Sequence, residues 1–232
     1  THLPSTPLVV VKLLKPSSND PATLQVAQRL FDTEAATLEQ LGKDNERIPS
    51  LYAYFALKGD FYLVQEYIAG TTLTGELQEG KISESDTLAI LKEILTGLTT
   101  VHRQNIIHRD LKPDNIIRRA SDRKLVLIDF GAVKQVRAAT VTTPSTTIGI
   151  GTEGYMPSEQ GIGYPKPASD IYAVGAIGIQ CLTGSLPHLL FNEHSLTIEW
   201  QHLCRVNRDL ATVLNKMVAP DYRQRYANAT EA

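Results

Sequence analysis

Residues 106–117, IIHRDLKPDNII, place a dense polar group between two pairs of isoleucines. Asp110, Lys112 and Asn115 lie close together in this group, and the later stretch LIDF adds Asp129. Carboxylate and amide oxygens are ligands that Mg²⁺ prefers, so Asn115 and Asp129 could hold this metal. Asp110 could then orient a hydroxyl nucleophile or accept its proton, while Lys112 neutralises charge on a transferring group. Phosphoryl transfer needs these parts: a metal, cations and accurate positioning.

Short strands are expected to hold this polar group in place. The pairs Ile106–Ile107 and Ile116–Ile117 and the run KLVLIDF are β-branched and apolar, which predicts three short strands. A helix should precede them, since SESDTLAILKEILTGLTTVHRQ carries leucines at helical spacing and has Ser83 or Ser85 as its N-cap. Four leucines share that spacing: Leu88, Leu91, Leu95 and Leu98.

The first part of the chain predicts the order strand, helix, strand, strand. The run LVVVKLL (8–14) indicates a buried strand in which Lys12 is the one charge. The next segment, NDPATLQVAQRLFDTEAATLEQLG, predicts a helix that Asp20 caps and Gly42 closes. Glu34 lies on the apolar face of that helix. The segments SLYAYFAL and FYLVQEYI, joined by KGD, form a hairpin pattern.

The later part of the chain predicts mostly helices. Residues 131–168 are rich in Gly, Thr, Pro and Ser and show no period, which indicates a long loop segment of functional importance. SDIYAVGAIGIQCLTG is apolar nearly all round, so we expect a helix buried inside the domain. DLATVLNKMV predicts a last amphipathic helix. The predicted elements change near residues 66–72 from mostly strands to mostly helices. The whole pattern therefore indicates an α+β fold in two lobes.

Composition limits the classes of function. The chain has 232 residues, of which 42% are apolar and 21% charged, enough for one large domain or two packed lobes. A net charge of −2 gives no support for binding to nucleic acid or to a membrane surface. No run of 18 apolar residues and no signal-peptide layout is present. Cys181 and Cys204 form neither a disulfide framework nor a metal pattern, which favours a cytoplasmic location.

The motifs HRDLKPDN and DFG together resemble the catalytic and magnesium-binding loops of eukaryotic-type protein kinases. VVVK, GTEGYMPSEQ, SDIYAVG and DYRQRY resemble further motifs of this family in the same order, so the resemblance runs from residue 8 to about 230. The Lys in DLKPDN resembles the serine/threonine form. PSEQ and LTGSLPH are similar to the corresponding sequences of bacterial, especially cyanobacterial, members.

The resemblance implies a two-lobe kinase fold and its activity. A partial N-lobe would span residues 1–68, with a strand, a helix, a hairpin and a hinge, and a helical C-lobe would span residues 69–232. The domain would transfer the γ-phosphoryl group of ATP, with Mg²⁺, to Ser or Thr hydroxyls of protein substrates. Self-association for autophosphorylation is also implied, whereas contact with nucleic acid or a membrane is not expected.

The resemblance also implies a role for each candidate residue. Lys12 would contact the α- and β-phosphates and pair with Glu34. Asp110 would be the base, Lys112 would contact the transferred phosphate, and Asn115 and Asp129 would hold Mg²⁺. Gln65 is similar to the gatekeeper, and the backbone of Glu66–Ile68 would bind adenine as the hinge. Thr152 belongs to the GT step at the end of the activation segment and completes the expected catalytic set.

Other residues would support the site. His108 would stack in the core with Phe130 and Leu38 and be anchored by Asp170, and Tyr54 would extend this stack. Glu159 would pair with Arg225. Arg109 would bind a phosphate on the activation segment, for which Thr146 and Thr147 are the first candidates and Thr140, Thr142, Thr143 and Ser145 the weaker ones.

Two other interpretations stay open at this stage. Eleven residues precede Lys12 in this sequence, none of them is Gly, and so no GxGxxG loop precedes Lys12. A non-catalytic pseudokinase that serves as a scaffold is the first alternative. The second is a small-molecule phosphotransferase with a related HxDxxxxN loop, against which GTEGYMPSEQ argues, since such enzymes lack this segment.

Overall fold

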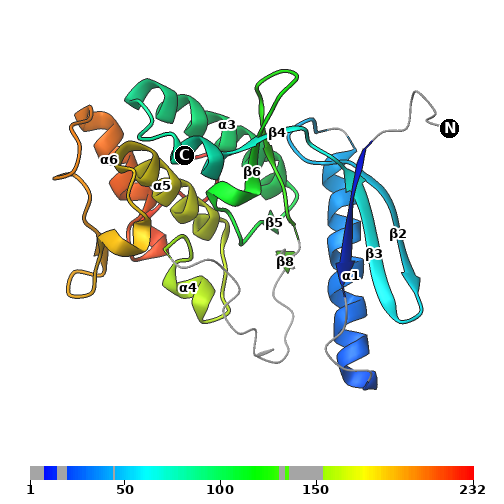
Figure 1. Cartoon of the computed structure of the whole chain (residues 1–232). Helices are drawn as coiled ribbons and strands as arrows, with labels where there is room; N and C mark the ends of the chain where they lie inside the picture. The colour runs from blue at the N-terminus through cyan, green and yellow to red at the C-terminus, as the bar shows by residue number, and fades with distance from the viewer. Residues whose placement is uncertain (1–7, 15–19, 44, 131–133, 136–153) are drawn as a thin grey trace.

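A computed structural model describes residues 8–14, 20–43, 45–130, 134–135 and 154–232. Figure 1 shows a three-stranded sheet and one long helix at one end of the molecule and a mainly helical part at the other. The smaller part, here the N-lobe, contains β1 (Val9–Leu14), α1 (Pro21–Gly42), β2 (Leu51–Leu57) and β3 (Asp60–Glu66). The order strand, helix, strand, strand is as the sequence predicts.

The N-lobe sheet is antiparallel with the order β1-β3-β2. Strand β3 alternates between half-buried and buried side chains, which is the period-2 pattern of a strand with one covered face. Its buried Phe61 ring lies 5.2 Å from that of Phe31 on α1, so the helix covers this face. Lys58 and Gly59 turn the hairpin with φ values of 54° and 88°, as a two-residue turn between twisted strands requires.

Strand β1 corrects one prediction, because it is not buried. Val9, Val11 and Leu13 are 41%, 55% and 46% exposed. The strand lies at the edge of its sheet, and these three side chains point to the face that α1 does not cover. Lys12 points the other way, opposite Leu63 of β3 and toward α1. An apolar run therefore indicated a strand correctly but not its burial.

Helix α1 presents Phe31, Leu38 and Leu41 to the core, where each is at most 5% exposed. Gly42 is the last residue of α1, so the prediction that it closes this helix is confirmed. A side chain would not fit at this position, because a Cβ would lie 2.5 Å from the carbonyl oxygen of Pro49. The chain after α1 therefore folds back tightly against the end of the helix.

The larger part, here the C-lobe, is built around a buried helix. Helix α5 (Pro167–Thr183) packs against α3 (Glu84–Arg103) and α6 (Arg208–Met217), and nearly every side chain of α5 is buried. This agrees with the prediction from its apolar sequence. Close packing depends on Gly175, where a Cβ would lie 2.7 Å from the Cβ of Met217. Of the helices that the structure describes, none has the length and apolar character of a membrane span.

Helix α3 begins where the sequence predicts, with Ser83 accepting a hydrogen bond from the Asp86 backbone N–H. The predicted leucine stripe is only partly right, because Leu88 is 41% exposed. Ile90 and Ile94 are buried instead, at 2% and 0% exposure. The apolar residues of this helix cover more than one stripe, and packing against α5 selects the face that becomes the core.

Short strands flank the polar loop as predicted: β5 (Ile106–Ile107), β6 (Ile116–Arg119) and β7 (Leu125–Leu127). Strand β6 pairs with both β4 (Gly70–Thr72) and β7, and β5 pairs with β8 (Lys134–Gln135). Several small elements were not predicted: α2 (Leu73–Gln78), the pair β9 (Phe191–Asn192) and β10 (Thr197–Ile198), and the 3₁₀ turns η2 (Pro187–Leu190) and η3 (Tyr222–Gln224). A helical turn, α4 (Ser158–Gly161), also interrupts the region predicted to be loop.

Candidate active site

The polar residues between β5 and β6 converge on Asp110. The Asn115 amide nitrogen donates to the backbone oxygen of Asp110 at 2.8 Å and to its carboxylate at 3.0 Å. The Lys112 ammonium lies 3.1 Å from the same carboxylate oxygen. A 3₁₀ turn, η1 (Pro113–Asn115), folds the chain so that Asn115 reaches back to Asp110. A carboxylate held between a cation and an amide is suited to act on a hydroxyl group.

A second cluster forms around Lys12. Its ammonium lies 3.0 Å from Oε1 of Glu34 on α1 and 2.7 Å from Oδ1 of Asp129, which follows β7. Burial on its own would lower the pKa of Lys12, but the two carboxylates outweigh it and raise the pKa above its ordinary value. Lys12 is therefore held as a cation between two elements that are far apart in the sequence.

The two clusters are joined through the backbone. The N–H of Ile128 donates to the carbonyl oxygen of Asn115 at 2.9 Å, so Asp129 emerges beside the loop that carries Asp110. Asp129 has a φ of 67°, a left-handed conformation that a non-glycine residue rarely adopts. Strain of this kind persists only where the surroundings hold it, and it is frequent at functional sites.

His108 is a core residue, as the resemblance implies. Its ring lies 4.6 Å from that of Phe130, its Nε2 lies 3.1 Å from the carbonyl oxygen of Ile128, and burial lowers the pKa of His108. Asp170 does anchor it, but through the backbone N–H of His108 at 2.9 Å. Tyr54 does not belong to this buried core, because it is 50% exposed and packs beside Phe31 at a ring distance of 5.9 Å.

The residues predicted for the hinge lie at the end of β3. Gln65 is 4% exposed, and its Oε1 has no hydrogen-bond partner among the described residues. Glu66 exchanges hydrogen bonds with Ser50, whose N–H donates to the Glu66 carboxylate at 3.1 Å. Ile68 is buried at 6% exposure. The predicted hinge thus lies between β3 of the N-lobe and β4 of the C-lobe. Its role in binding adenine stays a prediction.

Some predicted residues cannot be placed. Thr152 and the candidate phosphorylation sites Thr140, Thr142, Thr143, Ser145, Thr146 and Thr147 lie outside the described residues. Their roles therefore stay predictions. Arg109, the predicted partner of a phosphate, is 8% exposed, and its Nε has no partner among the described residues. Burial lowers the pKa of Arg109, against the charge of Asp170.

The donor set suits a hard cation. Asn115 and Asp129 offer one amide and one carboxylate oxygen, which fits Mg²⁺ because this ion keeps several waters and binds phosphate oxygens as well. Among the described residues, no group of three or more His, Cys, Asp or Glu side chains is arranged to hold a metal. An all-protein metal cage is thus not what the described part of the chain provides.

Comparison with known proteins identifies the family. The protein kinase domain family matches residues 1–232. The chain belongs to the protein kinase family. It is 45% identical over 237 residues to serine/threonine-protein kinase PknA of Nostoc sp. and 41% identical over 235 residues to serine/threonine-protein kinase D of Synechocystis sp.. These matches cover 100% and 99% of this chain but 42% and 46% of the relatives, so the chain spans about half of their length.

Such whole-chain relatives confirm the predicted cyanobacterial branch of eukaryotic-type serine/threonine kinases. A more distant relative, serine/threonine-protein kinase PknL of Mycobacterium tuberculosis, is 39% identical over 144 residues, which is 61% of this chain and 35% of the relative. The two-lobe fold of the family agrees with the described structure: a small sheet-rich lobe and a larger helical one.

A buried ion pair supports the kinase C-lobe, as predicted. Arg225 is fully buried, and its Nη1 lies 2.7 Å from Oε1 of Glu159 on α4. Ser169 donates to the same carboxylate oxygen at 2.7 Å. These contacts fasten the end of the activation segment to the start of α5 and to the chain after α6.

Sequence reasoning missed the contribution of His102. Its Nε2 lies 2.9 Å from Asp170, and its Nδ1 accepts a hydrogen bond from the N–H of Ala229 at 3.0 Å. Because Nδ1 accepts, the proton is on Nε2, which donates to the carboxylate. Asp170 also accepts from the N–H of Arg109 at 2.9 Å. A lone histidine inside a helix gave no sequence signal for this buried link.

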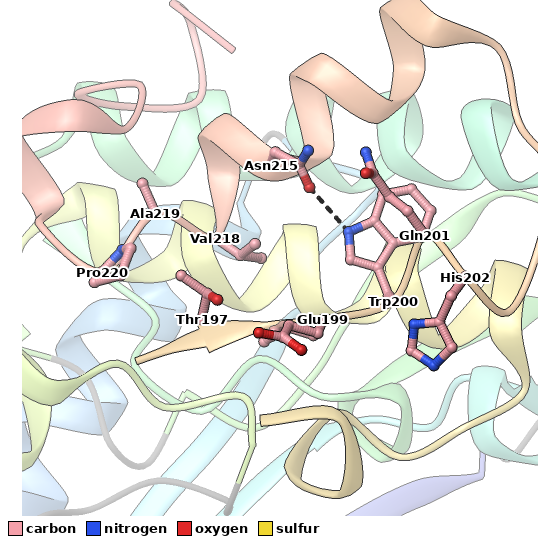
Figure 2. Close-up of a pocket in the computed structure, with 10 residues that line it drawn as sticks. Thr197, Glu199, Trp200, Gln201, His202, Asn215, Val218, Ala219 and Pro220 are labelled. Carbon is pink, nitrogen blue, oxygen red and sulfur yellow. Dashed lines mark hydrogen bonds between the residues drawn. The ribbon is translucent and has the colours of Figure 1, made fainter. Parts of the chain in front are cut away.

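A separate hollow lies in the C-lobe. Figure 2 shows its lining, in which Trp200 Nε1 donates to Asn215 Oδ1 at 3.0 Å. Its volume is about 440 Å³, and Glu199 and His202 also face it. None of the residues that line it was predicted for the kinase site. The hollow is therefore distinct from the clusters around Asp110 and Lys12.

Proposed function

We propose that this domain is a serine/threonine protein kinase that transfers the γ-phosphoryl group of ATP to Ser or Thr hydroxyls of proteins. The observation that carries the proposal is the position of the Lys12 ammonium, 3.0 Å from Glu34 and 2.7 Å from Asp129. An ammonium fixed in this way is suited to bind phosphate oxygens. Its partners come from α1 and from the end of β7, so the site depends on both lobes.

Each residue has a role in this proposal. Asp110 accepts the proton of the attacking hydroxyl, and Lys112, 3.1 Å from it, balances charge on the transferred group. Asn115 and Asp129 would hold Mg²⁺ with their side-chain oxygens. The bound metal ion would neutralise charge on the phosphate groups. Hydrogen bonds from Asn115 also keep the Asp110 carboxylate turned toward the site.

The remaining roles extend the same proposal. Gln65, Glu66 and Ile68 line the adenine side of the site, and Thr152 completes the catalytic set. The lobes divide into residues 1–68 and 69–232. This division is supported by Ala69, whose carbonyl oxygen accepts a hydrogen bond from Ala120 in the C-lobe at 2.8 Å.

Partners and location follow from the activity. The substrates would be proteins with Ser or Thr acceptors, and autophosphorylation between two copies would rise steeply with protein concentration. A cytoplasmic location is supported by Cys181 and Cys204, both of which are free thiols.

Transfer of labelled phosphate from ATP to a protein substrate tests the proposal. Asp110→Asn should lower the rate on the order of 10²–10⁴-fold, because it removes the base. Asp209→Asn on α6 is the matched control and should retain the wild-type rate, since this exposed aspartate lies at the first turn of a distant helix. Removal of Mg²⁺ with EDTA should stop transfer.

Two results would count against it. A wild-type rate in Asp110→Asn would exclude the base role. Binding of ATP and Mg²⁺ without any phosphate transfer by the wild-type chain would favour the pseudokinase scaffold instead.

A further inference from the structure

Arg47 lies in the connection between α1 and β2 and contacts the C-lobe. Its Nη1 donates to Oε2 of Glu93 on α3 at 2.8 Å and to the carbonyl oxygen of Leu125 at 3.4 Å. The two charged side chains are only 17% and 27% exposed. Burial on its own would raise the pKa of Glu93, but the bonds from Arg47 and from the Leu125 N–H lower it below its ordinary value. The pair therefore stays ionised and partly sheltered from water.

The backbone of strand β7 is held at both ends by this pair. The N–H of Leu127 donates to the carbonyl oxygen of Arg47 at 2.9 Å. The N–H of Leu125 donates to the Glu93 carboxylate at 3.0 Å. Gly97 leaves the room for this approach, since a Cβ there would lie 3.1 Å from Leu127 Cδ1. Arg47 thus contacts β7 with its backbone and its side chain together.

The elements joined at Arg47 are the ones that meet again at Lys12. Helix α1 carries Glu34 and ends at Gly42, shortly before Arg47. Strand β7 ends at Leu127, just before Asp129. From Glu34 to the end of α1 is a rigid distance of about 12 Å at 1.5 Å per residue, so the attachment at its end determines where Glu34 lies.

We propose that Arg47 is a positioning residue, which through Glu93 and strand β7 fixes α1 relative to Asp129 so that Lys12 pairs with both carboxylates. This inference rests on the proposed function, because pairing of Lys12 matters only if the site binds phosphate. Nothing in the contact requires Arg47 to touch a substrate. Arg47 acts on the site through α1 and β7, because it holds these two elements at a fixed distance from each other.

The neighbouring Glu46 offers a matched control in the same connection. Its carboxylate lies 2.5 Å from the Lys124 ammonium, but the two side chains are 60% and 38% exposed. Exposed ion pairs contribute little, because water screens them and both side chains lose freedom. Glu46→Gln should therefore change neither the structure nor the activity of the domain, although it alters the charge of the residue next to Arg47.

The first measurement is amide hydrogen exchange on the full chain as wild type, Arg47→Met, Arg47→Lys and Glu46→Gln. Arg47→Met keeps the aliphatic stem and removes the charge. It should raise exchange about tenfold or more at Leu125 and Leu127 and in the second half of α1, the range expected for loss of a hydrogen bond to a charged group. Arg47→Lys, which keeps a cation opposite Glu93, should restore most of the protection. Exchange in α5 should stay at the wild-type level.

The second measurement is steady-state kinetics. Arg47→Met should raise KM for ATP, so that kcat/KM for ATP falls about 2- to 30-fold, the range found for residues that couple packed elements. KM for the protein substrate should not change. A residue that only stabilises the fold would lower the active fraction and leave both KM values alone.

The outcomes separate the two proposals. Wild-type exchange in α1 and β7 of Arg47→Met would overturn the role of Arg47, as would raised exchange spread equally through α5 and α6. If the wild-type chain transfers no phosphate, the proposed function fails, but the exchange pattern still decides whether Arg47 joins α1 to β7.

Discussion

Replacement of Arg225 by Met would test how much the C-lobe depends on its buried ion pair. The guanidinium donates at 2.6–3.2 Å to five acceptor positions, which uses all of its N–H groups. Two are the oxygens of Glu159, and three are backbone carbonyl oxygens from both sides of the ion pair: Ala168, Ala219 and Pro220. Methionine fills a similar volume and donates none of these bonds.

The expected loss of stability follows from the state of Glu159 once Arg225 is removed. Glu159 is 8% exposed, and among the described residues the hydroxyl of Ser169 would be its one remaining side-chain donor. Breaking a buried ion pair by removal of one partner costs about 3–5 kcal/mol, because the other charge stays buried and unpaired. For a chain of this size, about 2–4 °C per kcal/mol gives a melting temperature lowered by about 6–20 °C.

Urea unfolding followed by fluorescence is the direct assay, because Trp200 is the single tryptophan of the chain and is 1% exposed. Arg223→Met is the matched control. Its side chain is 75% exposed and pairs locally with Asp221, so its unfolding midpoint should equal that of the wild type. Adding Glu159→Gln to Arg225→Met should restore about 1–3 kcal/mol, since no unpaired charge remains.

The reasoning would be refuted if Arg225→Met lost no more stability than Arg223→Met. It would also be refuted if the double variant were as unstable as the sum of the two single variants. That result would show that the two side chains stabilise the fold independently and not as a pair.

Two further predictions concern packing and pH. Gly175→Ala should cost about 1–3 kcal/mol of unfolding free energy, because its Cβ would lie 2.7 Å from Met217 Cβ and 2.8 Å from Val218 Cγ1. Gly161→Ala is the control and should be neutral, since the nearest atom to its Cβ would be Met156 Cε at 3.8 Å. Equal losses of stability in the two variants would contradict this prediction. Burial lowers the pKa of His108 below 6.5, so the unfolded chain binds more protons than the folded chain as the pH falls. The contribution of neutral His108 to the free energy of unfolding is therefore complete above pH 6.5 and is lost below it. The urea midpoint should therefore drop between pH 7.5 and 5.5 by more in the wild type than in His108→Phe, and equal drops would count against a neutral buried His108.

Sequence reasoning found the elements that carry the site because their patterns are local. The hairpin turn at Lys58 and Gly59 and the N-cap at Ser83 depend on a few neighbouring residues, and the structure has them where the sequence predicts. Burial was less predictable, since it depends on what packs against an element. Val11 looked like a core residue, but its side of the sheet is not covered by α1.

The candidate site shows the same division. Lys12, Glu34 and Asp129 were found through their motifs, and the structure contains the predicted pair of Lys12 with Glu34. The contact of Lys12 with Asp129 was not predicted. Arg47 and His102 were missed, because their partners lie far away in the sequence and no short motif marks them. Each is visible only when the fold brings Glu93 or Asp170 within hydrogen-bond distance.

The buried helix α5 illustrates why an apolar pattern understates function. Its sequence predicts a core element, yet Asp170, at 1% exposure, lies near its start. A carboxylate at such a place is unfavourable unless donors surround it, and the N–H groups of His108 and Arg109 and the Nε2 of His102 provide them. Arg109 has a left-handed backbone with a φ of 71°, a conformation of low stability for an arginine. The buried carboxylate and the strained loop therefore stabilise each other, and the residue that follows Arg109 is the proposed base, Asp110.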